Sequence, residues 1–114
     1  MDINAVASLH ARWVETRSRL TAENIANADT PEYRRAAGPA FADVLRGDPR
    51  PVAMRATHPS HIAPEPEAPG FAARREGAVA LQREMVDLAA NRRAHDLNVA
   101  VSAAFHRFHT SVAR

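Results

Sequence analysis

The sequence predicts an all-α fold: an N-terminal and a C-terminal helix form a coiled-coil-like hairpin, joined by a long, largely irregular middle segment. All eight prolines lie between Pro31 and Pro69, and all four glycines lie between Gly38 and Gly77. Proline is excluded from helix interiors and central strands, so this part is loop, turn and extended chain. The flanking parts show helical spacing of apolar residues. The predicted divisions are therefore residues 1–30, 31–77 and 78–114 of one structural unit.

Residues 3 to about 28 are predicted to form the first helix. Its apolar positions alternate spacings of three and four, which is a heptad pattern typical of a helix that packs against another helix. These positions are Val6, Leu9, Trp13, Thr16 and Leu20. The pattern does not say whether the partner helix belongs to the same chain.

Two asparagines mark the end of this helix. Asn24 and Asn27 are three residues apart and share one face. Because asparagine is a mediocre helix former, the pair indicates side-chain bonding to a neighbouring segment, although solvated amides at a helix end would give the same pattern. Thr30 precedes Pro31, so the helix should stop at or before Thr30.

The second helix is predicted over residues 78 to about 112. One apolar stripe contains Leu81, Met85 and Leu88. A second stripe lies beside it and contains Val86, Ala90, Leu97, Val101, Ala104, Phe108 and Val112, while Phe105 adds bulk near the C-terminus. A helix that is apolar on two adjacent stripes requires more than one partner.

The middle segment offers three local predictions. Phe41–Leu45 can make one helical turn, stopped by Gly47. Val52–Ala56 can form a short extended piece, and Ala63–Gly70 has the composition of a polyproline-like linker. So long a loop is unusual in a compact domain, so we expect it to order on assembly.

The most specific motif is Asn24-Ile25-Ala26-Asn27-Ala28-Asp29-Thr30-Pro31, followed by Tyr33. It closely resembles the N-terminal signature of the bacterial flagellar axial proteins, which are the rod, hook and hook-associated subunits. The resemblance assigns an assembly interface to Asn24, Ile25, Ala26, Asn27, Asp29, Thr30, Pro31 and Tyr33. The family usually has glycine where this chain has Glu32, so we expect this turn to be built differently.

The resemblance extends to Phe41–Leu45, Thr57–Ile62, and Gly77–Leu81 leading into Glu84 and Met85. Ala80 stands where the family commonly has a polar residue, so no side-chain cap is expected there. A chain of 114 residues has no room for a separate outer domain, which points to the small proximal-rod subunits. Two proximal-rod subunits of the family share the first motif. The Asp-Thr-Pro form of the motif and the Thr57–Ile62 segment favour one of these two subunits, and the second subunit remains the alternative.

The resemblance implies a structural subunit that self-assembles through its terminal helices into the axial drive shaft and export conduit. The implied partners are other rod subunits (FlgC-, FlgF- and FlgG-like), a FliE-like adaptor and the membrane ring. The implied location is the periplasmic rod of the basal body, reached without a cleaved signal peptide; the N-terminus shows no apolar run suited to one.

The residues themselves leave two other classes open. A small cytoplasmic helical adaptor or export chaperone would also be helical, free of cysteine and rich in alanine. All fifteen basic residues are arginine and the net charge is only +2. They are scattered rather than gathered in a stripe, which disfavours a nucleic-acid binder.

No catalytic, cofactor-binding or metal residue is predicted, and no small-molecule substrate. Ser8, Ser18, Ser60 and Ser102 lack the context of a catalytic nucleophile, and the isolated glycines form no phosphate loop. The histidine pairs His58–His61 and His106–His109 do not supply the three or four ligands of a zinc site, and cysteine is absent. Hydrophobic content is 46%, nearly half of it alanine, so a monomer would bury a small core.

Overall fold

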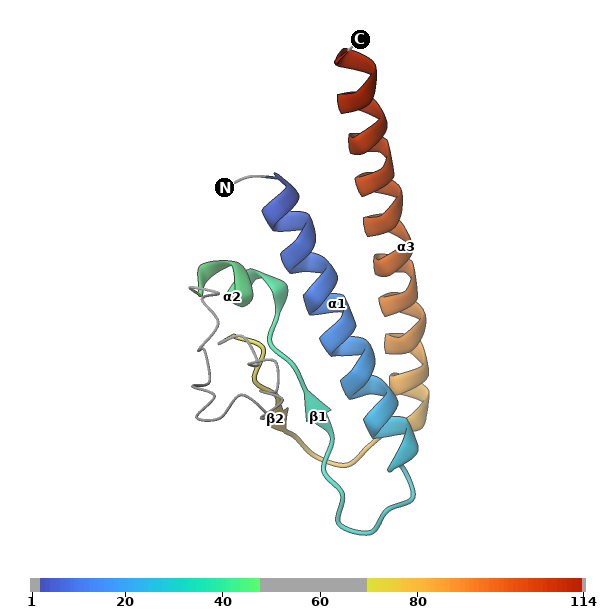
Figure 1. Cartoon of the computed structure of the whole chain (residues 1–114). Coiled ribbons are helices and arrows are strands. Elements are labelled where there is room, and N and C mark those ends of the chain that lie inside the picture. Colours follow the sequence, from blue (N-terminus) through green and yellow to red (C-terminus); the bar gives the residue numbers. More distant parts are fainter. Residues whose placement is uncertain (1–2, 48–69, 114) are drawn as a thin grey trace, which may run out of the picture.

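The structure is a computed structural model, and it describes residues 3–47 and 70–113. Along the chain lie α1 (Ile3–Ala26), β1 (Ala36–Ala37), α2 (Phe41–Arg46), β2 (Arg74–Arg75) and α3 (Leu81–Val112). The two long helices lie side by side and antiparallel, with the middle segment against α1 (Figure 1). The predicted helical hairpin is therefore confirmed. The predictions for Val52–Ala56, for Thr57–Ile62 and for the linker up to Pro69 lie outside the described residues.

The helix ends lie within a few residues of their predicted positions. α1 ends at Ala26, two residues early, and its last turn continues into a turn in which the Thr30 amide donates to the Asn27 carbonyl at 3.0 Å. α3 begins at Leu81, and no side chain caps it at Ala80, as expected from the alanine there. The predicted helical turn is α2, and the Gly47 amide closes it by donating to the Asp43 carbonyl.

A two-stranded ladder ties the ends of the middle segment together. β1 and β2 pair antiparallel, with Ala36 opposite Arg75 and Ala37 opposite Arg74. The Arg35 amide extends the ladder by donating to the Gly77 carbonyl at 2.9 Å. Alanine is depleted in strands and arginine is not a typical strand former, so composition did not predict this pairing.

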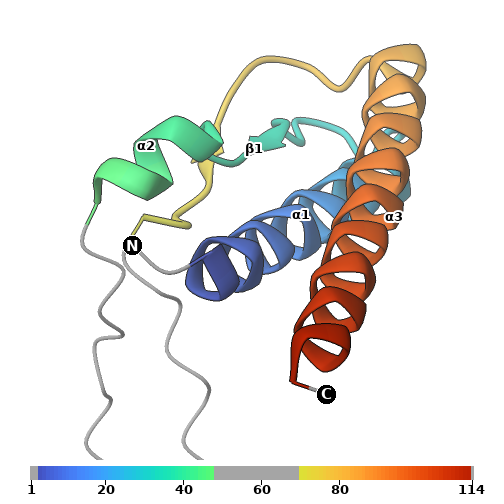
Figure 2. The same ribbon diagram turned by 90° about the horizontal axis from the view of Figure 1, so that it is seen from above.

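The apolar core lies between α1 and the middle segment. Leu9, Val44 and Phe71 are buried together, and Trp13 and Phe41 pack against them. The indole of Trp13 also donates a hydrogen bond to the Pro39 carbonyl at 3.0 Å. Viewed from above, α1 lies between α2 and α3 (Figure 2).

The heptad face of α1 lies against the middle segment. Leu9 and Trp13 face α2 and Phe71, and Leu20 lies so close to Gly38 that a β-carbon there would sit 3.3 Å from its Cδ1. Val6 is half-buried. Residues of α2 and of the neighbouring loops, rather than of the long α3, contact Leu9, Trp13 and Leu20.

The seam between α1 and α3 is largely polar. The Asn91 amide lies 3.4 Å from the Thr21 hydroxyl, and the Asn98 amide lies 3.4 Å from the Ala7 carbonyl. Glu84, Asn91 and Asn98 recur every seven residues, so α3 does present a heptad to α1, built from polar residues. Val14 is the buried apolar residue of α1 on this side. The apolar stripes predicted for α3 lie on other faces of the helix than this polar heptad.

The apolar stripes of α3 lie on its surface. The exposed positions are Leu81, Met85, Val86, Leu88, Leu97, Val101, Phe108 and Val112, with relative exposures between 40% and 69%. Phe105 is half-buried, with its ring 4.4 Å from that of His109. The C-terminal end of α3 projects beyond the N-terminal end of α1 (Figure 1). That this helix packs against further partners stays a prediction.

The turn after Pro31 contains a residue with a positive φ. Glu32 itself takes the left-handed conformation, with φ of 61°, and is the only such non-glycine residue in the described ranges. The following Tyr33 amide donates to the Thr30 carbonyl at 3.3 Å. The turn thus keeps the geometry that suits glycine, at a steric cost of about 1–2 kcal/mol for a residue with a β-carbon.

Replacing this residue by glycine is expected to stabilise the chain. Glu32→Gly relieves the strain of the positive φ but increases the entropy of the unfolded chain, so the net gain should be about 0.5–1 kcal/mol. Urea unfolding followed by circular dichroism measures it. Glu32→Ala is the control, because it removes the carboxylate and keeps the β-carbon, and it should give no gain. Equal effects of the two variants would contradict the explanation.

A candidate assembly site around Asn24 and Glu84

The side chain of Asn24 joins three segments of the chain. Its amide nitrogen donates to the Ala36 carbonyl at 2.9 Å and to Glu84 Oε2 at 3.1 Å. Its oxygen accepts from the Ala36 amide at 2.8 Å and lies 3.2 Å from the Tyr33 hydroxyl. Asn24 is fully buried, and both ends of its amide are occupied within the chain. It fastens the end of α1 to β1 and to the start of α3.

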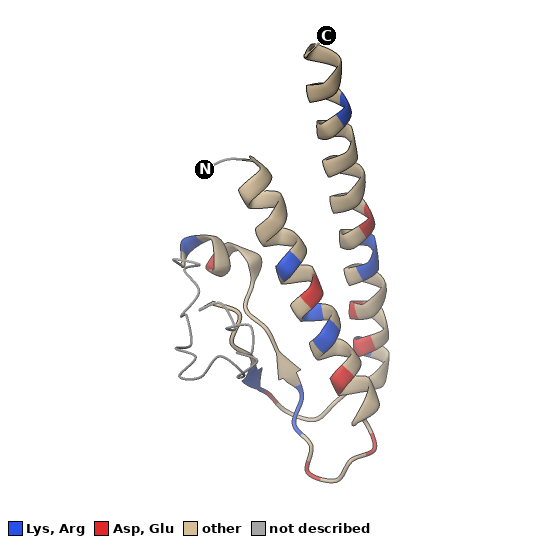
Figure 3. Ribbon diagram, in the orientation of Figure 1, with Lys and Arg blue, Asp and Glu red and all other residues tan. Residues whose placement is uncertain are grey.

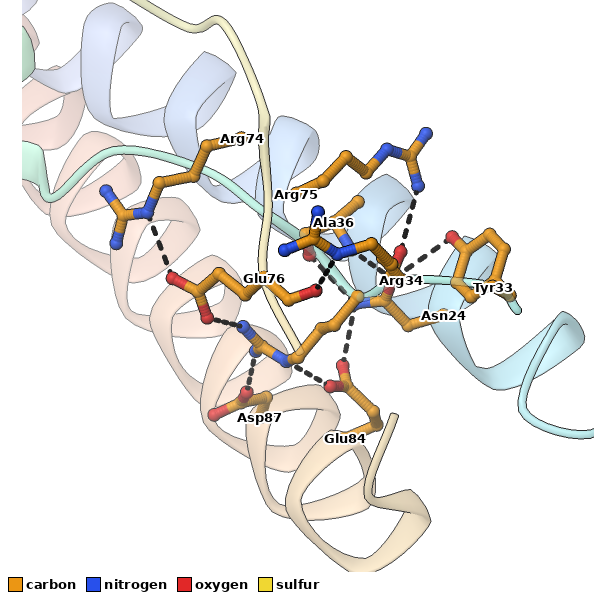
Figure 4. Close-up of polar contacts among 10 residues, drawn as sticks. Asn24, Tyr33, Arg34, Ala36, Arg74, Arg75, Glu76, Glu84 and Asp87 are labelled. Carbon is orange, nitrogen blue, oxygen red and sulfur yellow. Dashed lines mark hydrogen bonds and ion pairs between the residues drawn. The ribbon is translucent and has the colours of Figure 1, made fainter. Parts of the chain in front are cut away.

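Glu84 is the buried carboxylate at the centre of this site (Figure 4). Asn24 donates to one of its oxygens, and Arg35 Nε donates to the other. The rest of the Arg35 guanidinium donates to Asp87 Oδ2 at 2.9 Å and to Glu76 Oε2 at 3.2 Å. One guanidinium thus binds three carboxylates, from the start of α3 and from the segment after β2.

The buried charges of the site are paired with charges of opposite sign. Burial alone would lower the pKa of the Arg35 guanidinium, but Glu84, Asp87 and Glu76 raise it overall. No buried side-chain nitrogen or oxygen in the described residues lacks a hydrogen-bond partner. A buried ion pair contributes favourably only when its remaining polar atoms are satisfied, and this condition holds here.

The rim of the site is formed by Tyr33 and its neighbours. The Tyr33 hydroxyl lies 3.0 Å from Glu23 Oε1, and the guanidinium of Arg75 lies 5.4 Å from the centre of the phenol ring. Loss of hydration, with the hydrogen bond and charge of Glu23, raises the pKa of Tyr33 above its usual range, although Arg75 acts against this. Arg75 also pairs with Glu23 at 3.2 Å, which ties β2 to α1.

The remaining motif residues point away from the site or lie on its edge. Asn27 donates to the Glu23 carbonyl at 2.9 Å and accepts from the Thr30 hydroxyl at 3.2 Å, so it stabilises the helix end. Ile25 is half-buried. Four motif residues are exposed, namely Ala26, Asp29, Thr30 and Pro31. The motif therefore has an inward part, formed by Asn24 and Tyr33, and an exposed loop.

Across residues 3–47 and 70–113, no group of three or more His, Cys, Asp or Glu side chains is arranged to hold a metal ion. His58 and His61 lie outside these ranges. His106 and His109 sit on the last turns of α3 beside Phe105. None of the described helices is long and apolar enough to span a bilayer.

We next compared the chain with known proteins. No family model matches the chain. The flagellar basal body rod protein FlgB of Agrobacterium fabrum is 29% identical over 114 residues, and the alignment covers 90% of this chain and 85% of that protein. The chain is thus similar to FlgB over most of its length. This similarity confirms the resemblance to the flagellar axial proteins that the motif indicated.

Two features of this site were not predicted from the sequence. Arg35 appeared only as one of a scattered set of arginines, and no spacing rule singles it out. Glu84 belonged to a segment of the resemblance, but its role as a buried partner of Asn24, 60 residues away, had no local signal. Its heptad relation to Asn91 and Asn98 is the one pattern that a search for polar periodicity would have found.

The two asparagines of the motif should differ sharply in their contribution to stability. Asn24→Ala leaves the Ala36 amide, the Ala36 carbonyl and one Glu84 oxygen without a partner, and is expected to cost about 3 kcal/mol. Asn27→Ala is the matched control and should cost about 1 kcal/mol or less, because its bonds are near the surface. Urea unfolding measures both. Similar losses would show that Asn24 does not hold the buried site together.

The salt-bridge network also predicts a pH dependence. Hydrogen bonding and charge from Arg74, with the charge of Arg35, lower the pKa of Glu76 from 4.5. Its contribution to stability is therefore complete above pH 4.5 and is lost as the pH falls through the lower pKa of the folded state. Glu76→Gln should lower the melting temperature at neutral pH and converge with the original chain in acid. Asp43→Asn, at an exposed ion pair, is the control.

Proposed function

We propose that this chain is a structural subunit of the proximal rod of the bacterial flagellar basal body, and not an enzyme. The similarity to FlgB over most of both chains supports this. The structural observation that carries the proposal is the exposed apolar surface of α3. Monomeric proteins seldom expose an extended apolar patch, and such patches mark interaction surfaces.

The arrangement of this surface suits helix-driven assembly. Val86, Leu97, Val101 and Phe108 follow helical spacing along α3 and face away from the polar seam with α1. Each such side chain contributes about 1.5–3 kcal/mol when it is fully buried, so several together can hold subunits against one another. In this proposal the terminal helices dock onto neighbouring subunits and so form a drive shaft that also serves as an export conduit.

The Asn24–Tyr33 motif has two proposed roles, one inside the subunit and one between subunits. Asn24 acts inside the subunit, because its amide is fully used in joining α1, β1 and α3. The exposed loop of Asp29, Thr30 and Pro31 is then the part of the motif that faces neighbouring subunits. If Asn24→Ala combined with Asn27→Ala leaves assembly and motility intact, the two asparagines do not serve assembly.

The proposed setting is the periplasmic part of the basal body, reached through flagellar export without a cleaved signal peptide. Proposed partners are further copies of the chain, FlgC-, FlgF- and FlgG-like subunits, a FliE-like adaptor and the membrane ring. The sibling subunit FlgC is the alternative identity. Restoring motility in a strain that lacks FlgB, and not in one that lacks FlgC, would separate the two.

The experiment that tests the function is mass spectrometry of purified hook–basal bodies from the source cell, quantified against a ring protein. A few copies per particle are expected. Absence from the particle, with abundant protein in the cytosol, would contradict the rod proposal. That result would favour a cytoplasmic helical adaptor or export chaperone.

The role of α3 can be tested without disturbing the fold. Leu97→Gln combined with Phe108→Gln alters two side chains that are each 64% exposed, so the melting temperature should change little while incorporation into basal bodies falls at least about tenfold. Val99→Gln is the matched control, because Val99 is 54% exposed on the opposite face of the helix. Equal incorporation of both variants would show that the apolar stripe is not the docking surface.

A further inference from the structure

A cleft of about 500 Å³ opens beside the core cluster, between α1, the ladder segments and the start of α3. Its volume lies in the range of about 300–1,000 Å³ found for ligand-binding pockets. Trp13, Leu20 and Phe41 give it an apolar wall. Four arginines and two carboxylates complete the polar lining, so the lining carries a net charge of four minus two, or +2.

Two of these arginines have no carboxylate partner among the residues that the structure describes. Arg35 and Arg74 are paired with the lining carboxylates. The guanidinium of Arg17 instead stacks over the Trp13 ring, 4.7 Å from its centroid, and Arg83 forms no ion pair within residues 3–47 and 70–113. The cleft therefore presents two available cations beside an apolar wall, which suits a carboxylate-bearing segment.

A segment with the complementary charge lies elsewhere on the same chain. The loop between α1 and β1 carries Asp29 and Glu32, both exposed and neither ion-paired within the described residues. It forms the end of the molecule opposite the C-terminus and carries the acidic positions there (Figure 3). Its backbone is fixed by the Thr30–Asn27 and Tyr33–Thr30 hydrogen bonds.

This loop is held away from its own cleft. Asn24 binds both the amide and the carbonyl of Ala36, and Tyr33 is bonded to the end of α1, so both ends of the loop are fastened. Glu32 keeps an exposed carboxylate at a position with φ of 61°, where glycine would be less strained. An observed strained residue of this kind is a reasonable starting point for a functional hypothesis.

We propose that the cleft binds the Asp29–Glu32 loop of a second copy of this chain, with the carboxylates facing Arg17 and Arg83. This contact joins two different surfaces of identical chains, so it is heterologous and repeats from one copy to the next. Such a contact closes into a ring or continues as a helical series, depending on the rotation between neighbouring copies. The proposal rests on the proposed function, because it assumes that copies of the chain meet one another.

A charge-swap experiment tests the contact directly. One variant carries Asp29→Lys and Glu32→Lys, so its loop and cleft are both basic. The other carries Arg17→Glu and Arg83→Glu, so its loop and cleft are both acidic. Sedimentation velocity at low and high salt should show that each alone self-associates at least tenfold more weakly than the original chain. An equimolar mixture should restore association, because each loop then meets a cleft of opposite charge.

Controls separate this contact from misfolding and from general charge effects. Circular dichroism melts show that each variant is folded, and Glu15→Lys combined with Asp96→Lys changes two exposed carboxylates outside the loop. That control should associate like the original chain. Association of the original chain should weaken at high salt, since the contact is between exposed charges.

Several results would overturn the proposal. One is a mixture that associates no better than its separate components, and another is an original chain that stays monomeric at the highest concentration in low salt. A third is association that survives both charge variants but is lost in Leu97→Gln with Phe108→Gln. If basal bodies still contain the chain in these cases, the rod function stands and only the loop-in-cleft contact fails.

Discussion

The structure depends on the burial of one carboxylate. Glu84 is fully removed from solvent, and an unpaired charge in such a place would be strongly destabilising. Its oxygens are satisfied by Asn24 from the end of α1 and by Arg35 from the residue before β1. The end of α1, the residue before β1 and the start of α3 must therefore come together in one register before the carboxylate can be buried. The helical hairpin can form only when these contacts are made.

This requirement explains how α3 takes one fixed position on α1 although the apolar core is small. The core cluster lies on the far side of α1 and does not fix where α3 sits. The polar heptad of Glu84, Asn91 and Asn98 does, because each side chain needs a specific partner on α1. Apolar contacts tolerate a sliding helix better than hydrogen-bonded pairs do. Buried polar groups can specify the register of paired helices in this way.

Much of the fold could be predicted from the sequence, because its strongest signals are local. The confinement of proline and glycine to the middle segment placed both long helices, and the Phe41–Leu45 turn was found with its stop at Gly47. The face of each helix that meets its partner could not be predicted. That choice depends on pairs such as Asn24 with Glu84, which lie far apart in sequence. Apolar periodicity alone favoured α3 residues that are exposed in the folded chain.

The apolar stripes of α3 are exposed in the single chain, and this exposure bears on assembly. The apolar stripe of Val86, Leu97, Val101 and Phe108 is a packing signal, and nothing in the described chain covers it. If the polar seam fixes the hairpin, the apolar stripe remains free for contacts between subunits. One face of α3 then fixes its register against α1, and another face provides the apolar contacts between subunits. A helix whose internal contacts require exact partners, and whose external contacts require only burial, can join neighbours without rearranging its own fold.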